Sequence, residues 1–144
     1  MTDSAMPPFE EWARHPSASR LGDPLWTVQA YRLSSYALEC HSHDAREAPA
    51  LARASTFDQL TRSIGSIAAN IAEGYSRPTS ADRAKFYGYA LGSTREAIVW
   101  YDSVRRELGD VVTQRQAILV QVRRLLLTTL RRSRNRDGTS SLRD

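Results

Sequence analysis

The sequence predicts an all-α protein built as an antiparallel, up-and-down four-helix bundle. Four segments carry apolar residues at helical spacing, no segment alternates with a period of two, and the connections between segments are short. We expect the bundle over residues 23–132, between a flexible N-terminal arm (residues 1–22) and a disordered basic tail (residues 133–144). Phe9 and Trp12 are expected to be an isolated aromatic pair in this arm, with a docking motif as the alternative.

Capping residues delimit the first two helices. The first is expected over residues 24–41, because Asp23 is a good N-cap and Pro24 suits the first helical position. The second is expected to begin at Thr56, which forms a capping box with Gln59, and to end at Gly74.

The second half of the chain predicts two longer helices. The third begins at Thr79, directly after the helix breaker Pro78, and ends at Gly109. The fourth follows Asp110 and extends to about Arg132. The longest connection is expected over residues 42–55.

The composition excludes several classes of protein. Cys40 is the single cysteine, so an intramolecular disulfide framework and a cysteine-rich zinc site are excluded. The first residues lack the basic and then apolar pattern of a secretory signal. No apolar run approaches the roughly 18 residues that a membrane span needs. We therefore expect a soluble cytoplasmic protein that does not contact a membrane.

Basic residues concentrate near the C-terminus and are almost all arginine. Residues 105–144 contain 10 basic and 4 acidic side chains, whereas residues 1–104 contain 10 and 12. The planar guanidinium binds phosphate oxygens in pairs, so an arginine-rich helix favours nucleic-acid binding. The expected nucleic-acid-binding residues are Arg115, Arg123, Arg124, Arg131, Arg132, Arg134 and Arg136. A solvated face, with arginine favoured by codon usage, is the alternative.

Two helices carry unusual residues on the side opposite their core stripe. The second helix presents Leu60, Ile64, Ile67, Ala68 and Ile71 to the core, while Arg62, Ser66, Asn70 and Glu73 lie opposite. In the third helix, Gly88 and Gly92 lie on the outer side with Val99, and Glu96 is nearby. Glycine inside a helix is unfavourable unless another helix approaches closely. These residues predict interhelical or subunit contacts, and hence self-association; an ordinary surface stripe is the alternative.

Few residues suggest catalysis. Cys40, His41, His43 and Asp44 are close in sequence and have the side-chain types of a metal or thiol site, but no second cluster supplies further ligands. Glu73 and Glu96 are an acid–base pair only if they do not pair with arginines. No phosphate-binding glycine loop is present in the sequence. We therefore expect no enzymatic activity, no metal and no cofactor.

The central stretch QLTRSIGSIAANIAEGYSRPTSADRAKFYGYALGSTREA resembles the 23S rRNA intervening-sequence proteins, also called four helix bundle proteins. The resemblance covers about residues 25–130. It rests on Gln59, Leu60, Arg62, Ser63, Ser66, Ile67, Asn70, Ile71, Ala72, Glu73, Gly74, Arg77, Gly92, Ser93 and Glu96.

The resemblance implies a non-enzymatic four-helix bundle that assembles into a ring, typically a pentamer with a central channel. Related bundles are similar to accessory variability proteins of diversity-generating retroelements, which bind a reverse transcriptase and its template RNA. It also implies that Arg62, Asn70 and Glu73 make polar contacts between helices or subunits. The leading expectation is an oligomer that binds structured RNA. The alternative is a protein-only scaffold that docks a partner protein.

Overall fold

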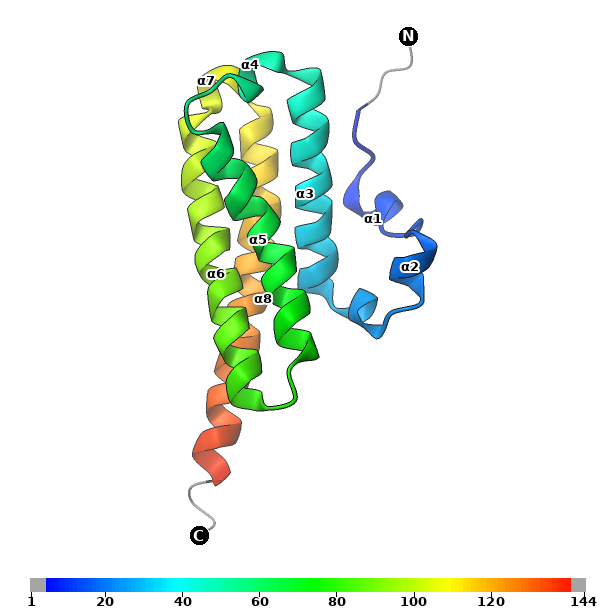
Figure 1. Cartoon of the computed structure of the whole chain (residues 1–144), viewed down its shortest axis with the longest axis vertical. Coiled ribbons are helices and arrows are strands. Elements are labelled where there is room, and N and C mark those ends of the chain that lie inside the picture. Colours follow the sequence, from blue (N-terminus) through cyan, green and yellow to red (C-terminus); the bar gives the residue numbers. More distant parts are fainter. Residues whose placement is uncertain (1–4, 141–144) are drawn as a thin grey trace.

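The computed structural model describes residues 5–140 as a set of helices that pack around one core (Figure 1). Four are long: α3 (Gln29–Glu47), α5 (Phe57–Ser76), α6 (Ser80–Ser103) and α8 (Val111–Ser140). Their directions alternate, and each contacts two others, α5 with α6, α6 with α8, α8 with α3 and α3 with α5. No strand occurs in residues 5–140, so the prediction of an all-α protein is confirmed.

Short helices lie at the connections. Three precede α3: α1 (Phe9–Trp12), α2 (Ala18–Leu21) and the 3-10 helix η1 (Pro24–Thr27). At one end of the molecule, α4 (Pro49–Ala52) connects α3 with α5, and α7 (Arg105–Leu108) connects α6 with α8 (Figure 1).

Each long helix contributes one apolar stripe to the core. The predicted stripe of α5 is confirmed, because residues three or four apart share one side of a helix. Fully buried members include Leu60, Ile64, Ile67 and Ile71 from α5, Ala90 and Ala97 from α6, and Val112, Leu119 and Val122 from α8.

The predicted N-cap Thr79 is confirmed, whereas Asp23 caps the short helix η1 and not the long helix predicted over residues 24–41, which begins only at Gln29 as α3. The predicted capping box is wrong. The side chain of Asp23 accepts a hydrogen bond from the Leu25 amide, and that of Thr79 accepts one from the Asp82 amide. Thr56 precedes α5 without capping it. Its hydroxyl instead hydrogen-bonds the Ser103 hydroxyl at 2.8 Å, so it links the start of α5 to the end of α6.

The segment predicted as a loop over residues 42–55 is mostly helical. Helix α3 continues six residues beyond His41, since no breaker occurs before Pro49. Ala48 leaves the helical conformation, as is common for a residue that precedes proline. The short helix α4 then follows directly.

Gly74 does not end α5, contrary to the prediction. It is buried inside the helix, and a Cβ atom at this position would lie 2.8 Å from the Tyr87 ring. The glycine is therefore required by close packing between α5 and α6. The helix ends two residues later, where Arg77 is extended before Pro78.

The third predicted helix is interrupted before Gly109. Helix α6 ends at Ser103, and α7 forms a separate short turn. Gly109 has a φ of 73°, a conformation that strongly favours glycine, and it reverses the chain into α8.

The prediction of a flexible N-terminal arm is wrong where the structure describes it; residues 1–4 lie outside the described part. The ring centroids of Phe9 and Trp12 lie 5.5 and 5.3 Å from that of Tyr36 on α3, and Trp12 also contacts Trp26. The Tyr36 hydroxyl donates a hydrogen bond to the Pro7 carbonyl at 2.8 Å. Burial of large aromatic rings holds this segment in place. The N-terminal segment therefore covers the side of α3 that carries Tyr36.

The predicted disordered tail is also wrong over residues 133–140, which continue α8 without a break; residues 141–144 lie outside the described part. Arginine is a good helix former, and the first glycine of this segment is Gly138. The last turns of α8 project beyond the connection between α5 and α6 (Figure 1).

Candidate nucleic-acid interface

The arginines of α8 lie in three rows along the helix. Arg124 and Arg131 are seven residues apart and therefore share one side. Arg132 and Arg136, four residues apart, share a second side, and Arg123 lies with Arg134 on a third. All six were predicted as nucleic-acid contacts, but they do not form one continuous stripe.

Most of these side chains point into solvent. Arg124, Arg131, Arg132, Arg134 and Arg136 are exposed, and Arg123 is partly buried. Within the described residues, no carboxylate forms an ion pair with Arg123, Arg124, Arg131, Arg132 or Arg134. Their positive charge is therefore not neutralised within the described chain, which favours contact with an external anion.

Arg115 is not part of this surface, so its prediction as a nucleic-acid contact is wrong. Its side chain is buried, and its Nε and Nη2 atoms each donate a hydrogen bond of 2.8 Å to the two carboxylate oxygens of Asp44. Position 115 falls on the same side of α8 as Leu119 and Val122, which face the core. The bidentate ion pair fastens α8 to α3.

The Asp44–Arg115 pair belongs to a buried polar cluster that also includes Tyr36, Cys40 and Tyr101. Burial raises the pKa of Tyr36 to about 12 and raises those of the Cys40 thiol and the Tyr101 hydroxyl. Burial is the largest single effect on the pKa of Arg115 and lowers it, but the hydrogen bonds to Asp44 and the electrostatic interactions with Cys40, Asp44 and Tyr101 together raise that pKa. Because these pKa values are raised, the two tyrosines and the thiol stay protonated and the arginine stays charged.

The cysteine–histidine segment has structural roles in this fold. The Cys40 thiol is fully buried and protonated, and both carboxylate oxygens of Asp44 are used by Arg115. His41 contacts Thr61 through Nε2 at 2.9 Å. In residues 5–138, no three cysteine, histidine or acidic side chains are grouped as ligands of a metal ion. The geometry thus adds no support to a metal or thiol site.

The polar side of α5 makes one direct contact between helices. The Ser93 hydroxyl on α6 donates to the Ser66 hydroxyl on α5 at 3.1 Å, and the Asn70 amide donates back to Ser66 within α5. Glu73 pairs with Arg77 one turn later on the exposed side. Arg62 is exposed. The predicted interhelical role is therefore visible for Ser66 alone among the four predicted residues.

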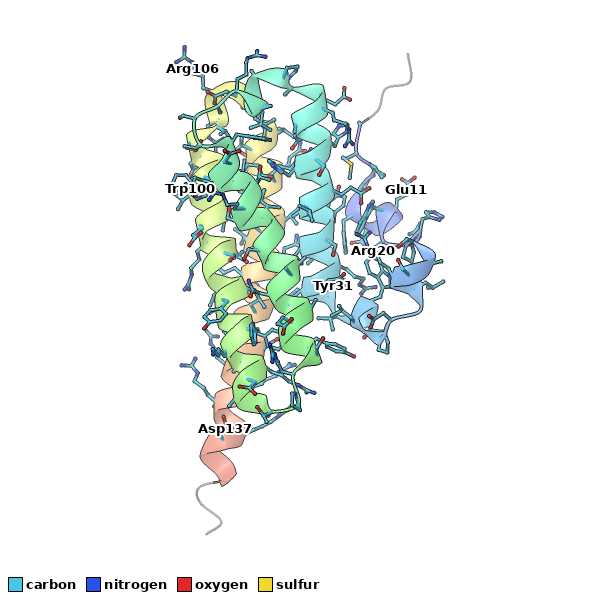
Figure 2. All side chains as sticks on the ribbon, in the orientation of Figure 1. Glu11, Arg20, Tyr31, Trp100, Arg106 and Asp137 are labelled. Atoms are coloured by element: carbon cyan, nitrogen blue, oxygen red, sulfur yellow. The ribbon has the colours of Figure 1, made fainter. Side chains whose placement is uncertain are left out.

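The outer side of α6 carries exposed apolar side chains. Val99 is 60% exposed and Tyr89 is 51% exposed, and Glu96 is exposed between them. A Cβ atom at Gly88 or Gly92 would meet nothing within 4 Å. Trp100 lies at the outer edge of the same helix (Figure 2). The close approach that these glycines predict is not made within the described chain.

A pocket that the sequence reasoning missed lies beside the arginines of α8. It has a volume of about 340 Å³ and is bounded by the end of α5, the start of α6 and residues 129–136 of α8. Tyr75 and Arg83 line it together with Arg132 and Arg136. Tyr75 and Arg83 lie on either side of the short connection between α5 and α6. This closeness in sequence was the one signal from which their proximity could have been predicted.

The fold and the surface define a small all-helical protein with an arginine-rich C-terminal helix. None of its described helices has the length and apolar character needed to cross a lipid bilayer. Residues 30–121 match the family model described as 23S rRNA-intervening sequence protein, so the chain belongs to that family. Comparison with curated proteins and with solved structures gave no match. The family match includes neither the N-terminal segment nor Arg123 and the arginines that follow it.

Proposed function

We propose that this protein is a non-enzymatic, self-associating RNA-binding protein whose contact surface is the exposed part of α8. The observation that carries the proposal is the set of arginines on α8 without carboxylate partners. The family description, which refers to ribosomal RNA, supports an RNA-related role. Guanidinium groups on several sides of one projecting helix suit the phosphates of a folded RNA.

The protomer is an antiparallel four-helix bundle in this proposal, and the outer side of α6 is its contact with other copies. Gly88 and Gly92 leave the backbone open, and Val99 and Tyr89 supply apolar area. Small residues allow helix backbones to approach closely. The resemblance implies a ring of five subunits. Assembly repeats the basic helix around the ring and raises affinity through multivalency.

The resemblance also favours one biological setting, that of an accessory protein for the reverse transcriptase of a diversity-generating retroelement. In this setting the arginines of α8 hold the template RNA. The α6 surface stays occupied by neighbouring subunits, and the polymerase contacts the assembled ring.

A protein-only scaffold is the second candidate, and the exposed apolar side of α6 favours it. In that case α6 docks a partner protein and the arginines form a solvated surface. The two candidates differ in one measurable property, because only the first requires RNA affinity that depends on Arg124 and Arg131.

The deciding experiment measures binding of a fluorescent hairpin RNA by anisotropy at several salt concentrations. The double variant Arg124→Glu/Arg131→Glu should abolish binding without changing the circular dichroism spectrum. Each phosphate contact should contribute about 0.7–0.9 to the slope of log K against log salt. Unchanged affinity in this variant refutes the RNA-binding proposal and favours the scaffold.

A matched control places the same charge change at the opposite end of the molecule. Arg53 follows α4, and Arg106 lies on α7, far from the end of α8 (Figure 2). Both are exposed. The variant Arg53→Glu/Arg106→Glu has the same net charge as the test variant, so it should retain most of the RNA affinity if position matters.

Self-association is tested separately by light scattering. Gly92→Leu should lower the molar mass, because the added side chain keeps the facing helix away. Ala81→Leu, on an exposed position in the first turn of α6, should leave the mass unchanged. An intact oligomer in the Gly92→Leu variant shows that subunits meet elsewhere.

A further inference from the structure

The pocket at the projecting end of α8 brings one of the arginine rows, Arg132 and Arg136, together with residues of α5 and α6. Figure 1 shows the elements that form it at one end of the molecule, where the α5–α6 connection passes beside α8. Val28, just before α3, also lines it. Three parts of the chain that are distant in sequence, Val28, residues 75–87 and residues 129–136, thus meet at one concave site. Its volume of about 340 Å³ is at the small end of the range for ligand sites.

The charged residues in the described wall of the pocket are Arg83, Arg132 and Arg136. Within the described chain, no carboxylate forms an ion pair with Arg83 or Arg132. These two guanidinium groups in one pocket favour an anionic ligand with several oxygens.

Arg83 is held in position before any ligand arrives. Its Nε atom donates a hydrogen bond of 2.7 Å to the carbonyl of Arg77 in the α5–α6 connection. Arg77 is itself fixed by an ion pair with Glu73 and by its guanidinium, which lies 4.6 Å from the centre of the Phe86 ring. A donor that is already oriented loses less entropy when it binds.

Two tyrosines give the pocket an aromatic wall. Tyr87 packs on Gly74, so its ring belongs to the contact between α5 and α6. Tyr75 is 37% exposed and lines the same pocket. An accessible ring beside phosphate-binding arginines is the arrangement with which proteins hold an unpaired nucleotide, whose base stacks while its phosphate is neutralised.

From this arrangement we infer that the pocket binds one unstacked nucleotide of a single-stranded RNA segment. Arg83 and Arg132 contact its phosphate, and the base stacks on Tyr75. The inference rests on the proposed RNA-binding function and deepens it. The arginines on the outer side of α8 hold RNA of any form, whereas this pocket selects unpaired RNA, since bases in a duplex are not free to stack on a side chain.

The test compares a fluorescent 12-nucleotide single strand with its blunt duplex. The wild-type protein should bind the single strand more tightly. Tyr75→Leu should lower single-strand affinity about tenfold, because stacking of one base contributes on this order, and should leave duplex affinity unchanged. The double variant Arg83→Gln/Arg132→Gln, which removes both contacts to this one phosphate, should reduce the salt slope for the single strand by about 0.7.

Tyr31→Leu is the matched control, since Tyr31 is a partly exposed tyrosine that contacts Trp26 and does not line the pocket. The readout is the ratio of single-strand affinity to duplex affinity. This ratio should stay at the wild-type value in Tyr31→Leu. Strands with a 5′-phosphate or a 5′-hydroxyl distinguish a terminal phosphate from an internal phosphodiester as the bound group.

Each outcome supports or overturns the inference. An unchanged ratio in Tyr75→Leu, together with loss of all RNA binding in Arg124→Glu/Arg131→Glu, overturns the pocket and leaves the proposed function intact. If the wild-type protein binds neither the single strand nor the duplex, both the pocket inference and the proposed RNA-binding function are overturned. Binding of polyglutamate that RNA does not displace shows that the pocket is a site for acidic peptides and also overturns the inference.

Discussion

Replacement of the buried Asp44–Arg115 pair tests most directly how the helices are held together. Arg115→Met removes two hydrogen bonds of 2.8 Å and leaves the Asp44 carboxylate buried without its cation. Asp44→Leu leaves the guanidinium in the same position. In the double variant Asp44→Leu/Arg115→Met, neither charge remains, and apolar atoms of similar volume fill the space.

The burial of both partners sets the size of the effect. Their side chains are only 9% and 6% exposed, so solvent does not screen the charge that remains in a single variant. Removing one partner of a buried pair costs about 3–5 kcal/mol, whereas replacing both with apolar residues is often neutral or stabilising. Each single variant should therefore lose about 3–5 kcal/mol, and the double variant should lie within about 1 kcal/mol of the wild type.

Urea unfolding followed by circular dichroism gives the four free energies of this cycle. The coupling energy between the two positions should be at least about 3 kcal/mol. Arg105→Met, which breaks the solvent-exposed pair with Asp102, is the control and should show no comparable loss. Additive losses in the double variant, or single variants that match the wild type, contradict the structural role assigned to the pair.

Three further predictions follow from the packing. Burial lowers the pKa of His41 below 6.5, so the unfolded chain takes up a proton that the folded chain does not. The free energy of unfolding should keep its full value above about pH 6.5 and should fall as the pH decreases below it. Urea unfolding between pH 5 and pH 7 should show a smaller pH dependence of this free energy in His41→Gln than in the wild type. Gly74→Ala should destabilise the protein by about 1–2 kcal/mol, because the added methyl meets the Tyr87 ring, whereas Gly65→Ala should stabilise it by about 0.5–1 kcal/mol; thermal melts of both variants check this. Trp12→Ala should release the N-terminal segment, seen as faster amide hydrogen exchange in residues 9–21, and leave exchange in α5 and α6 unchanged.

The tautomer of His41 gives the pH prediction its physical basis. The Thr61 hydroxyl donates to the Phe57 carbonyl at 2.9 Å, so its oxygen accepts the proton carried by His41 Nε2. His41 Nδ1 is then an unprotonated nitrogen, and it is buried without a hydrogen-bond partner among the described residues. Protonation would place a second N–H there with no acceptor, which opposes the charged form.

The sequence predicted the helices well where local chemistry controls them. Thr79 caps its helix as expected, because a cap is a hydrogen bond between residues two or three apart. Asp23 also makes such a bond, but it caps only the short helix η1, and α3 begins later at Gln29. The apolar spacing of α5 placed its buried stripe correctly for the same local reason. The prediction failed at Thr56, whose hydroxyl is used by Ser103, a residue 47 positions away in the chain.

In the candidate site, too, the sequence predicted local properties and missed contacts between distant residues. The high arginine content and the scarcity of acidic residues located the basic helix, but they led to the same prediction, nucleic-acid contact, for Arg115 and Arg124. The structure separates them, since one is buried against Asp44 and the other is exposed. In the pocket formed by Tyr75, Arg83 and Arg132, the sequence places only Tyr75 and Arg83 near each other, because Arg132 belongs to a helix that meets them only after folding.

Residue spacing and composition within single helices were enough to predict an all-helical protein, the starts of several helices and a concentration of positive charge near the C-terminus. They did not predict that the N-terminal aromatics cover α3, that Gly74 admits Tyr87, or that the arginines of α8 divide between an ion pair, a pocket and solvent. These features appear only in the folded protein, because burial and pairing depend on which side chains from distant segments meet, and a local pattern does not contain that information.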